Sequence, residues 1–188
     1  CPDLHILVMD DSSPDGTAAL AKDEANSLGG IEVVVRPVKE GLGAAYRHGF
    51  RHALDAGYDP VGQMDADFSH QPEVLPSLFG AVADGADVAV GSRYVPGGSV
   101  PNWTYFRRAL SRWGNGYARF MLRLQLRDAT TAFRVYTADT LEKIDIDGTR
   151  ANGYLFQIET AFRLSDVGAV ITELPITFVD RVAGNSKM

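Results

Sequence analysis

The 188-residue chain contains a single cysteine, Cys1, which excludes an intrachain disulfide and favours a reducing compartment. It has no apolar run approaching the roughly 18 residues that cross a bilayer, and no signal peptide is visible. Lys and Arg number 18 against 24 Asp and Glu, so the formal net charge of −6 argues against binding to nucleic acid. With 45% hydrophobic residues, the composition predicts one globular domain over residues 1–188.

Strand and helix patterns alternate through the first half of the chain. Apolar and β-branched runs predict strands at 5–10, 31–36, 61–65 and 86–94, and helical patterns lie at 17–28, 41–57 and 72–85. This alternation predicts an α/β fold with a mostly parallel sheet and helices on both of its faces. The second half predicts a long helix over about 104–124, a strand within 129–136, a helix over 152–168 and a strand over 169–179.

Two carboxylates, Asp65 and Asp67, follow the third predicted strand in the stretch VGQMDADFSHQPE. In open parallel sheets, ligands bind beyond the carboxyl ends of the strands. Two carboxylates placed there repel one another and lose solvation, and a divalent cation offsets both costs. The pattern therefore predicts a clamp for Mg²⁺ or Mn²⁺ and for the phosphates that such ions bind.

Other interpretations of this pair are also consistent with the sequence. The aspartates could be exposed loop residues that cap the following helix, or one could be the nucleophile of an aspartyl phosphatase. An EF-hand loop that starts at Asp65 is excluded, because His70 and Pro76 stand where glycine and glutamate are required.

A concentration of positive charge follows in residues 103–127, which contain six arginines and no acidic residue. Apolar side chains recur there at spacings of three or four, at Phe106, Leu110, Trp113, Tyr117, Phe120 and Leu124. Cationic, aromatic-rich amphipathic helices lie in membrane interfaces or bind anionic lipid head groups. The alternative is a helix that turns its apolar stripe to the core and its arginines to solvent.

Further cationic residues follow predicted strands, namely Arg93 in GSRY and Arg181 and Lys187 in DRVAGNSKM. Each alone could be surface charge, but together with the carboxylates they predict a site that binds several phosphates. We expect the four histidines, His5, His48, His52 and His70, to be structural or exposed rather than catalytic.

Taken in order, several motifs resemble those of one enzyme family: LVMDDSSPDGT, KEGLGAAYRHGF, MDADFSHQPE, VGSRYVPGG, NWTYFRRALS, DATTAFRVY, GYLFQIE and ELPITFVDRVAGNSKM. They resemble the polyprenol (dolichol) phosphate mannose synthases of glycosyltransferase family 2, and are most similar to the actinobacterial members. The resemblance covers nearly the whole chain and implies the GT-A fold, which is Rossmann-like.

The resemblance implies inverting transfer of mannose from GDP-mannose to a polyprenyl phosphate, assisted by Mg²⁺ or Mn²⁺. It implies that Asp11 contacts the donor nucleoside and that Asp65 and Asp67, with Ala66 beside them, bind the metal and the donor diphosphate. Ser69 stands where some relatives carry a glutamine ligand. The remaining implied contacts to acceptor phosphate or diphosphate are Arg93, Arg107, Ser111 and Arg181, while Lys187 covers the site.

The chain departs from this family at its start, because relatives have an additional N-terminal strand that would be central to the sheet. The resemblance further implies a peripheral protein at the cytoplasmic face of the cell membrane, attached through the basic helix or a membrane-anchored partner protein. Transfer of another sugar to the same lipid, or a non-catalytic module that binds nucleotide or lipid phosphate, are the alternative functions.

Overall fold

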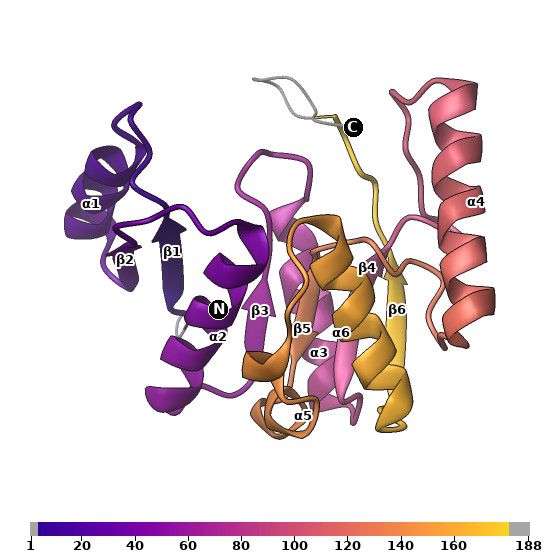
Figure 1. Ribbon diagram of the computed structural model, residues 1–188. Helices are drawn as coiled ribbons and strands as arrows, with labels where there is room; N and C mark the ends of the chain where they lie inside the picture. The colour runs from indigo at the N-terminus through magenta and orange to yellow at the C-terminus, as the bar shows by residue number, and fades with distance from the viewer. Residues whose placement is uncertain (1–3, 181–188) are drawn as a thin grey trace.

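The computed structural model describes residues 4–180, and its elements follow the predicted alternation (Figure 1). The strands are β1 (Ile6–Asp10), β2 (Ile31–Val35), β3 (Val61–Gln63), β4 (Val88–Ser92), β5 (Arg134–Tyr136) and β6 (Ile171–Pro175). The helices are α1 (Thr17–Leu28), α2 (Leu42–Asp55), α3 (Leu75–Ala83), α4 (Tyr105–Leu122), α5 (Ala138–Lys143) and α6 (Tyr154–Asp166), with short 3₁₀ turns η1 (Pro72–Val74) and η2 (Ile146–Gly148). The sequence patterns did not predict α5 or η2.

The strands form two sheets, a β1–β2 pair and a four-stranded sheet of order β3-β5-β4-β6. Pairing is parallel in β1–β2 and β4–β6, whereas β5 is antiparallel to both β3 and β4. The predicted α/β class is therefore confirmed, and β5 makes the larger sheet mixed. Within residues 4–180 no strand pairing joins β1 to β3, although α2 contacts both. The additional central strand stays a prediction.

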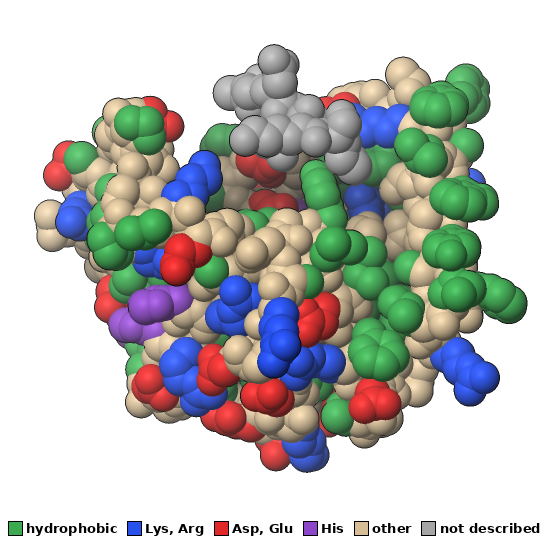
Figure 2. Space-filling model, in the orientation of Figure 1, with side chains coloured by type: hydrophobic (Ala, Val, Ile, Leu, Met, Phe, Trp, Pro, Cys, Tyr) green, Lys and Arg blue, Asp and Glu red, His purple; other side chains and the backbone are tan. Residues whose placement is uncertain are grey.

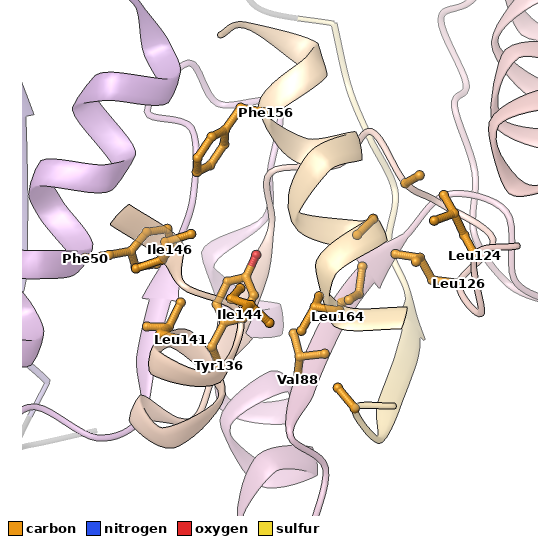
Figure 3. Packing of buried hydrophobic residues seen from close by; sticks show 14 residues of the cluster. Phe50, Val88, Leu124, Leu126, Tyr136, Leu141, Ile144, Ile146, Phe156 and Leu164 are labelled. Atoms are coloured by element: carbon orange, nitrogen blue, oxygen red, sulfur yellow. The ribbon is translucent and has the colours of Figure 1, made fainter. Parts of the chain in front are cut away.

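Alternating side chains of the larger sheet pack into two separate clusters. Val88 and Val90 of β4 face a large cluster that includes Phe50 of α2 and Leu164 of α6 (Figure 3). Ala89, between the two valines, faces the opposite cluster, where α3 packs. Because successive strand residues point to opposite faces, this alternation places helices on both sides of the sheet, as predicted.

Thr104 caps the N-terminus of helix α4, and its hydroxyl accepts the Arg107 N–H. The apolar stripe within the helix is exposed rather than packed in the core, whereas Leu124, the last residue of the predicted stripe, lies beyond the helix and is buried. Trp113 is 67% exposed and Phe120 is 81% exposed, and hydrophobic side chains gather along the outer side of this helix in Figure 2. The interpretation of α4 as a core-facing helix is therefore wrong. Across residues 4–180, no helix combines the length and the apolar character needed to cross a membrane.

Candidate active site

Those predicted site residues that fall within 4–180 lie at one edge of the two sheets, where parallel strands end. The segments after β1, β3 and β4 begin there, and the described chain also ends there, at Asp180 (Figure 1). Because β5 runs antiparallel, the segment that precedes it arrives at the same edge. A hollow opens between α4 and the part of the molecule that contains β1 and β2, with acidic side chains inside it (Figure 2).

Asp11 follows β1 and pairs with Arg36, which follows the neighbouring strand β2. The Arg36 Nε atom lies 3.3 Å from the Asp11 Oδ1 atom, and Arg36 also reaches Glu40 at 3.1 Å. Asp10 is buried, and its carboxylate accepts the Ser13 N–H at 2.9 Å. Parallel pairing of β1 with β2 thus fixes the position of Asp11, which is predicted to contact the nucleoside.

The Asp65–Ser69 segment turns sharply beyond β3. Phe68 has a positive φ of 62° and an exposed side chain, while Ser69 is buried. The Ser69 N–H donates to the Asp67 carboxylate at 3.1 Å, which orients that carboxylate. Ala66 is exposed between the two half-buried aspartates. The turn therefore holds both carboxylates at the edge of the sheet, as the sequence predicts.

Asp65 also receives a hydrogen bond that the sequence analysis missed. The Tyr46 hydroxyl, from α2, donates to the Asp65 Oδ1 atom at 2.6 Å. Burial, together with the nearby Asp65 charge, raises the pKa of Tyr46 well above its usual value. Tyr46 is therefore a hydrogen-bond donor throughout the neutral pH range.

Arg93 follows β4 and is buried against Asp128. Its Nε and Nη2 atoms donate to the two carboxylate oxygens at 2.7 Å each, and its backbone N–H donates at 3.0 Å. Nη2 also donates to Thr130 at 2.6 Å. Burial by itself raises the pKa of Asp128, but the hydrogen bonds and charge of Arg93 outweigh it and hold that pKa below its usual value. This pairing gives Arg93 a structural function in addition to its predicted phosphate contact.

Arg107 and Ser111 lie one turn apart on α4, near its N-terminal end. Arg107 lies over the Trp103 ring, 4.2 Å from its centroid, and donates to both Asp180 oxygens at 2.8 and 3.0 Å. The Ser111 hydroxyl is 2.6 Å from the Tyr94 hydroxyl. These contacts fix the N-terminal part of α4 beside the segment that follows β4.

The segment 178–180 connects the carboxylates with the cationic helix. The Phe178 ring lies 5.4 Å from the His70 ring, and the Val179 N–H donates to the Ser69 carbonyl at 3.3 Å. Asp180 then pairs with Arg107. The predictions for Arg181 and Lys187 fall outside the described residues.

Sequence reasoning missed Asp128 and Asp180 because ion pairs between distant segments leave no local pattern. Both residues stand inside motifs that carry the family resemblance, DATTAFRVY and PITFVDR, and this was the signal available for them. Tyr46 likewise stands in GLGAAYRHG. The three residues contact predicted site residues from different elements.

Comparison with known proteins identifies the same family that the sequence motifs resemble. A family model described as glycosyl transferase family 2 matches residues 1–145. The chain is 49% identical, over its full length, to polyprenol monophosphomannose synthase of Mycolicibacterium smegmatis and to undecaprenyl-phosphate mannosyltransferase of Micrococcus luteus. It covers 71% of the first relative and 76% of the second.

Solved structures with lower sequence identity share the fold. A mycobacterial protein matches with a TM-score of 0.67 at 19% identity, and the matched region covers 97% of this chain and 58% of that one. Glucosyl-3-phosphoglycerate synthase from Mycobacterium tuberculosis, in complex with Mn²⁺, UDP-glucose and phosphoglyceric acid, matches with a TM-score of 0.65 at 20% identity, over 96% of this chain and 60% of that one. The chain spans about three fifths of these solved proteins. It is a glycosyltransferase that belongs to glycosyl transferase family 2, within the group of polyprenyl-phosphate mannose synthases that its motifs resemble.

Proposed function

We propose that this enzyme transfers mannose from GDP-mannose to a polyprenyl phosphate with inversion at the sugar carbon. The observation that carries the proposal is the meeting of the Asp65–Asp67 pair with the cationic end of α4, through segment 178–180, at the ligand-binding edge of the sheets. The relatives at 49% identity, whose names state mannose transfer to a polyprenyl carrier, support the choice of substrates.

A divalent ion, Mg²⁺ or Mn²⁺, would be held by Asp65 and Asp67. Their half-buried carboxylate oxygens are the donors that such ions prefer. Within residues 4–180, no group of three or more His, Cys, Asp or Glu residues is placed to hold a metal ion, so the protein would supply two carboxylate ligands. Two carboxylates leave positions open to the donor phosphates and water. The bound ion would stabilise the negative charge that develops on the departing GDP.

The acceptor needs no strong base, because a phosphate monoester carries about 1.5 to 2 negative charges at pH 7. One of its oxygens attacks the anomeric carbon of mannose while the bond from that carbon to the diphosphate oxygen breaks, which yields polyprenyl phosphomannose and GDP. Arg107 and Ser111 are proposed to bind this acceptor phosphate. Arg93, in the segment after β4, would add positive charge near this phosphate, while its Nε and Nη2 atoms donate to Asp128.

The exposed stripe of α4 is proposed to lie in the membrane interface, where the lipid acceptor resides. The stripe combines exposed aromatic side chains with arginines, in a protein whose formal net charge is −6. Anionic head groups would attract this helix although they repel the protein as a whole. The family resemblance further suggests that the enzyme works at the cytoplasmic face, with a membrane-anchored partner protein as an additional expectation.

The deciding experiment is calorimetric titration of GDP-mannose with and without Mn²⁺, with UDP-glucose as the competitor. We expect metal-dependent binding that is selective for GDP-mannose, followed by transfer of labelled mannose to polyprenyl phosphate. Selectivity for UDP-glucose would indicate a glucosyltransferase, and binding without transfer would indicate a non-catalytic module. Phosphate release without sugar transfer would indicate the aspartyl phosphatase.

A further inference from the structure

Asp65 is approached by side chains from two different parts of the chain. Tyr46 of α2 donates to Oδ1, and the Nε2 atom of His70 lies 3.7 Å from Oδ2. Within residues 4–180, Tyr46 therefore stands at one oxygen of the carboxylate and His70 at the other. Residues that hold a metal ligand in this way commonly set its orientation and its affinity for the ion.

Tyr46 is itself held rigidly. Its ring stacks on Phe156 with centroids 5.6 Å apart and planes at 10°, and it lies 6.2 Å from the Phe50 ring. The contact with Phe156 joins α2 to α6, and the two ring contacts together fix the hydroxyl at the carboxylate. A short hydrogen bond from a packed tyrosine restricts the rotation of Asp65 more strongly than an exposed partner would.

His70 is unusual because its side chain is only 1% exposed and neither ring nitrogen has a hydrogen-bond partner among residues 4–180. Its ring lies 5.0 Å from Phe133 and 5.4 Å from Phe178, so it packs between aromatic side chains. A buried polar atom without a partner costs about 1–3 kcal/mol, and an apolar side chain in this aromatic environment would avoid that cost. The nitrogen closest to a possible partner is the one that faces Asp65, just beyond hydrogen-bonding distance.

We propose that Tyr46 and His70 are positioning residues that hold the Asp65 carboxylate in its metal-binding orientation, one at each oxygen. This inference rests on the proposed function, in which Asp65 binds the ion. Tyr46 fixes Oδ1 through its hydrogen bond, and His70, whose Nε2 atom lies 3.7 Å from Oδ2, would donate a hydrogen bond to that oxygen in the metal-bound site. Each residue acts through Asp65 and touches neither substrate.

The test compares the variants Tyr46→Phe, His70→Leu and His70→Gln with the unmodified protein. Tyr46→Phe removes one oxygen and keeps the stacking on Phe156. His70→Leu removes both nitrogens, whereas His70→Gln restores a donor near the position of Nε2. Tyr136→Phe is the matched control, because it also removes a buried tyrosine hydroxyl, one that lies 3.5 Å from the Arg134 side chain.

Calorimetry with Mn²⁺ as the titrant, at a fixed concentration of GDP, measures the affinity for the ion independently of turnover. We expect Tyr46→Phe and His70→Leu each to weaken Mn²⁺ binding about 10–100-fold, the range found when partners of metal ligands are removed. His70→Gln should recover part of that loss, and Tyr136→Phe should match the unmodified protein. A purely structural role predicts the opposite for His70→Leu, namely unchanged Mn²⁺ affinity with equal or higher thermal stability.

The outcomes separate this inference from the proposed function. If the unmodified protein binds GDP in an Mn²⁺-dependent manner and both Tyr46→Phe and His70→Leu retain its Mn²⁺ affinity, the positioning role is overturned and the proposed function stands. If the unmodified protein binds GDP equally well without Mn²⁺, the metal clamp fails and the positioning role fails with it.

Discussion

Replacing Asp128 by asparagine should strongly destabilise the protein, because it removes the counter-charge of a buried arginine. Arg93 is 7% exposed and Asp128 is fully buried, and they share two side-chain hydrogen bonds of 2.7 Å. Asparagine keeps the shape but not the charge. Breaking one half of a buried pair costs about 3–5 kcal/mol, because the partner charge stays buried without compensation. In a chain of this size, each kcal/mol of lost stability lowers the melting temperature by about 2–4 °C, so the melting temperature of Asp128→Asn should fall by roughly 6–20 °C.

Thermal unfolding followed by circular dichroism measures this change directly. The matched control is Asp139→Asn, which breaks the exposed pair with Lys143 and should leave the melting temperature unchanged. The double substitution Arg93→Met with Asp128→Leu should recover most of the loss, because no buried charge remains. If Asp128→Asn lowers the free energy of unfolding by less than about 1 kcal/mol, the buried-pair argument is refuted, because exposed ion pairs contribute that little.

The same pair sets a direction for pH dependence. The pKa of Asp128 is lower in the folded protein than its usual value of 3.8, so the folded state binds this proton more weakly than the unfolded state does. The resulting stabilisation is fully present above about pH 4 and is lost as the pH falls through the folded pKa. The stability difference between the unmodified protein and Asp128→Asn should therefore shrink in acid, as chemical denaturation at several pH values would measure.

Three further predictions concern ligands. Asp67→Ala should abolish Mn²⁺-dependent GDP-mannose binding in calorimetry while the melting temperature changes little; equal affinity would contradict the metal clamp. Arg107→Ala should raise the KM for polyprenyl phosphate about 10–100-fold, as expected for a charged hydrogen bond, with GDP-mannose affinity retained. Arg119→Ala, on the same helix, is the control. A larger effect of Arg107→Ala on the GDP-mannose affinity than on the KM for polyprenyl phosphate would show that Arg107 binds the donor diphosphate instead. Trp113→Ser should weaken flotation with anionic lipid vesicles about tenfold, as expected for partial burial of a large apolar side chain. Leu20→Ser, which changes an equally exposed side chain on α1, should leave flotation with the vesicles unchanged. An equal loss of vesicle binding in both variants would contradict docking through α4.

The order of most helices and strands was predictable because their patterns are local, although α5 and η2 were not predicted. Alternating and β-branched runs marked the strands, and the 3.6-residue period marked α4 to within about two residues at each end. The Asp65–Asp67 pair could be placed at the binding edge by the same logic, since a parallel strand that ends in carboxylates delivers them there. The motifs also identified the family, which the comparisons confirm.

Which way the stripe of α4 faces could not be read from its period, because an amphipathic pattern is the same whether its apolar side meets a core or a membrane. The direction of β5 was equally hidden, because a three-residue strand has no pattern that distinguishes parallel from antiparallel pairing.

The sequence by itself determined the α/β alternation, the family and the carboxylates at the strand end, all of which depend on neighbouring residues. Only the tertiary structure decided that Arg93 is neutralised by Asp128, that Arg107 pairs with Asp180 and that Tyr46 holds Asp65. These pairs join residues between 19 and 73 positions apart. Their geometry follows from how the sheets and helices pack, and a charge or hydroxyl in the sequence carries no record of the partner it will meet.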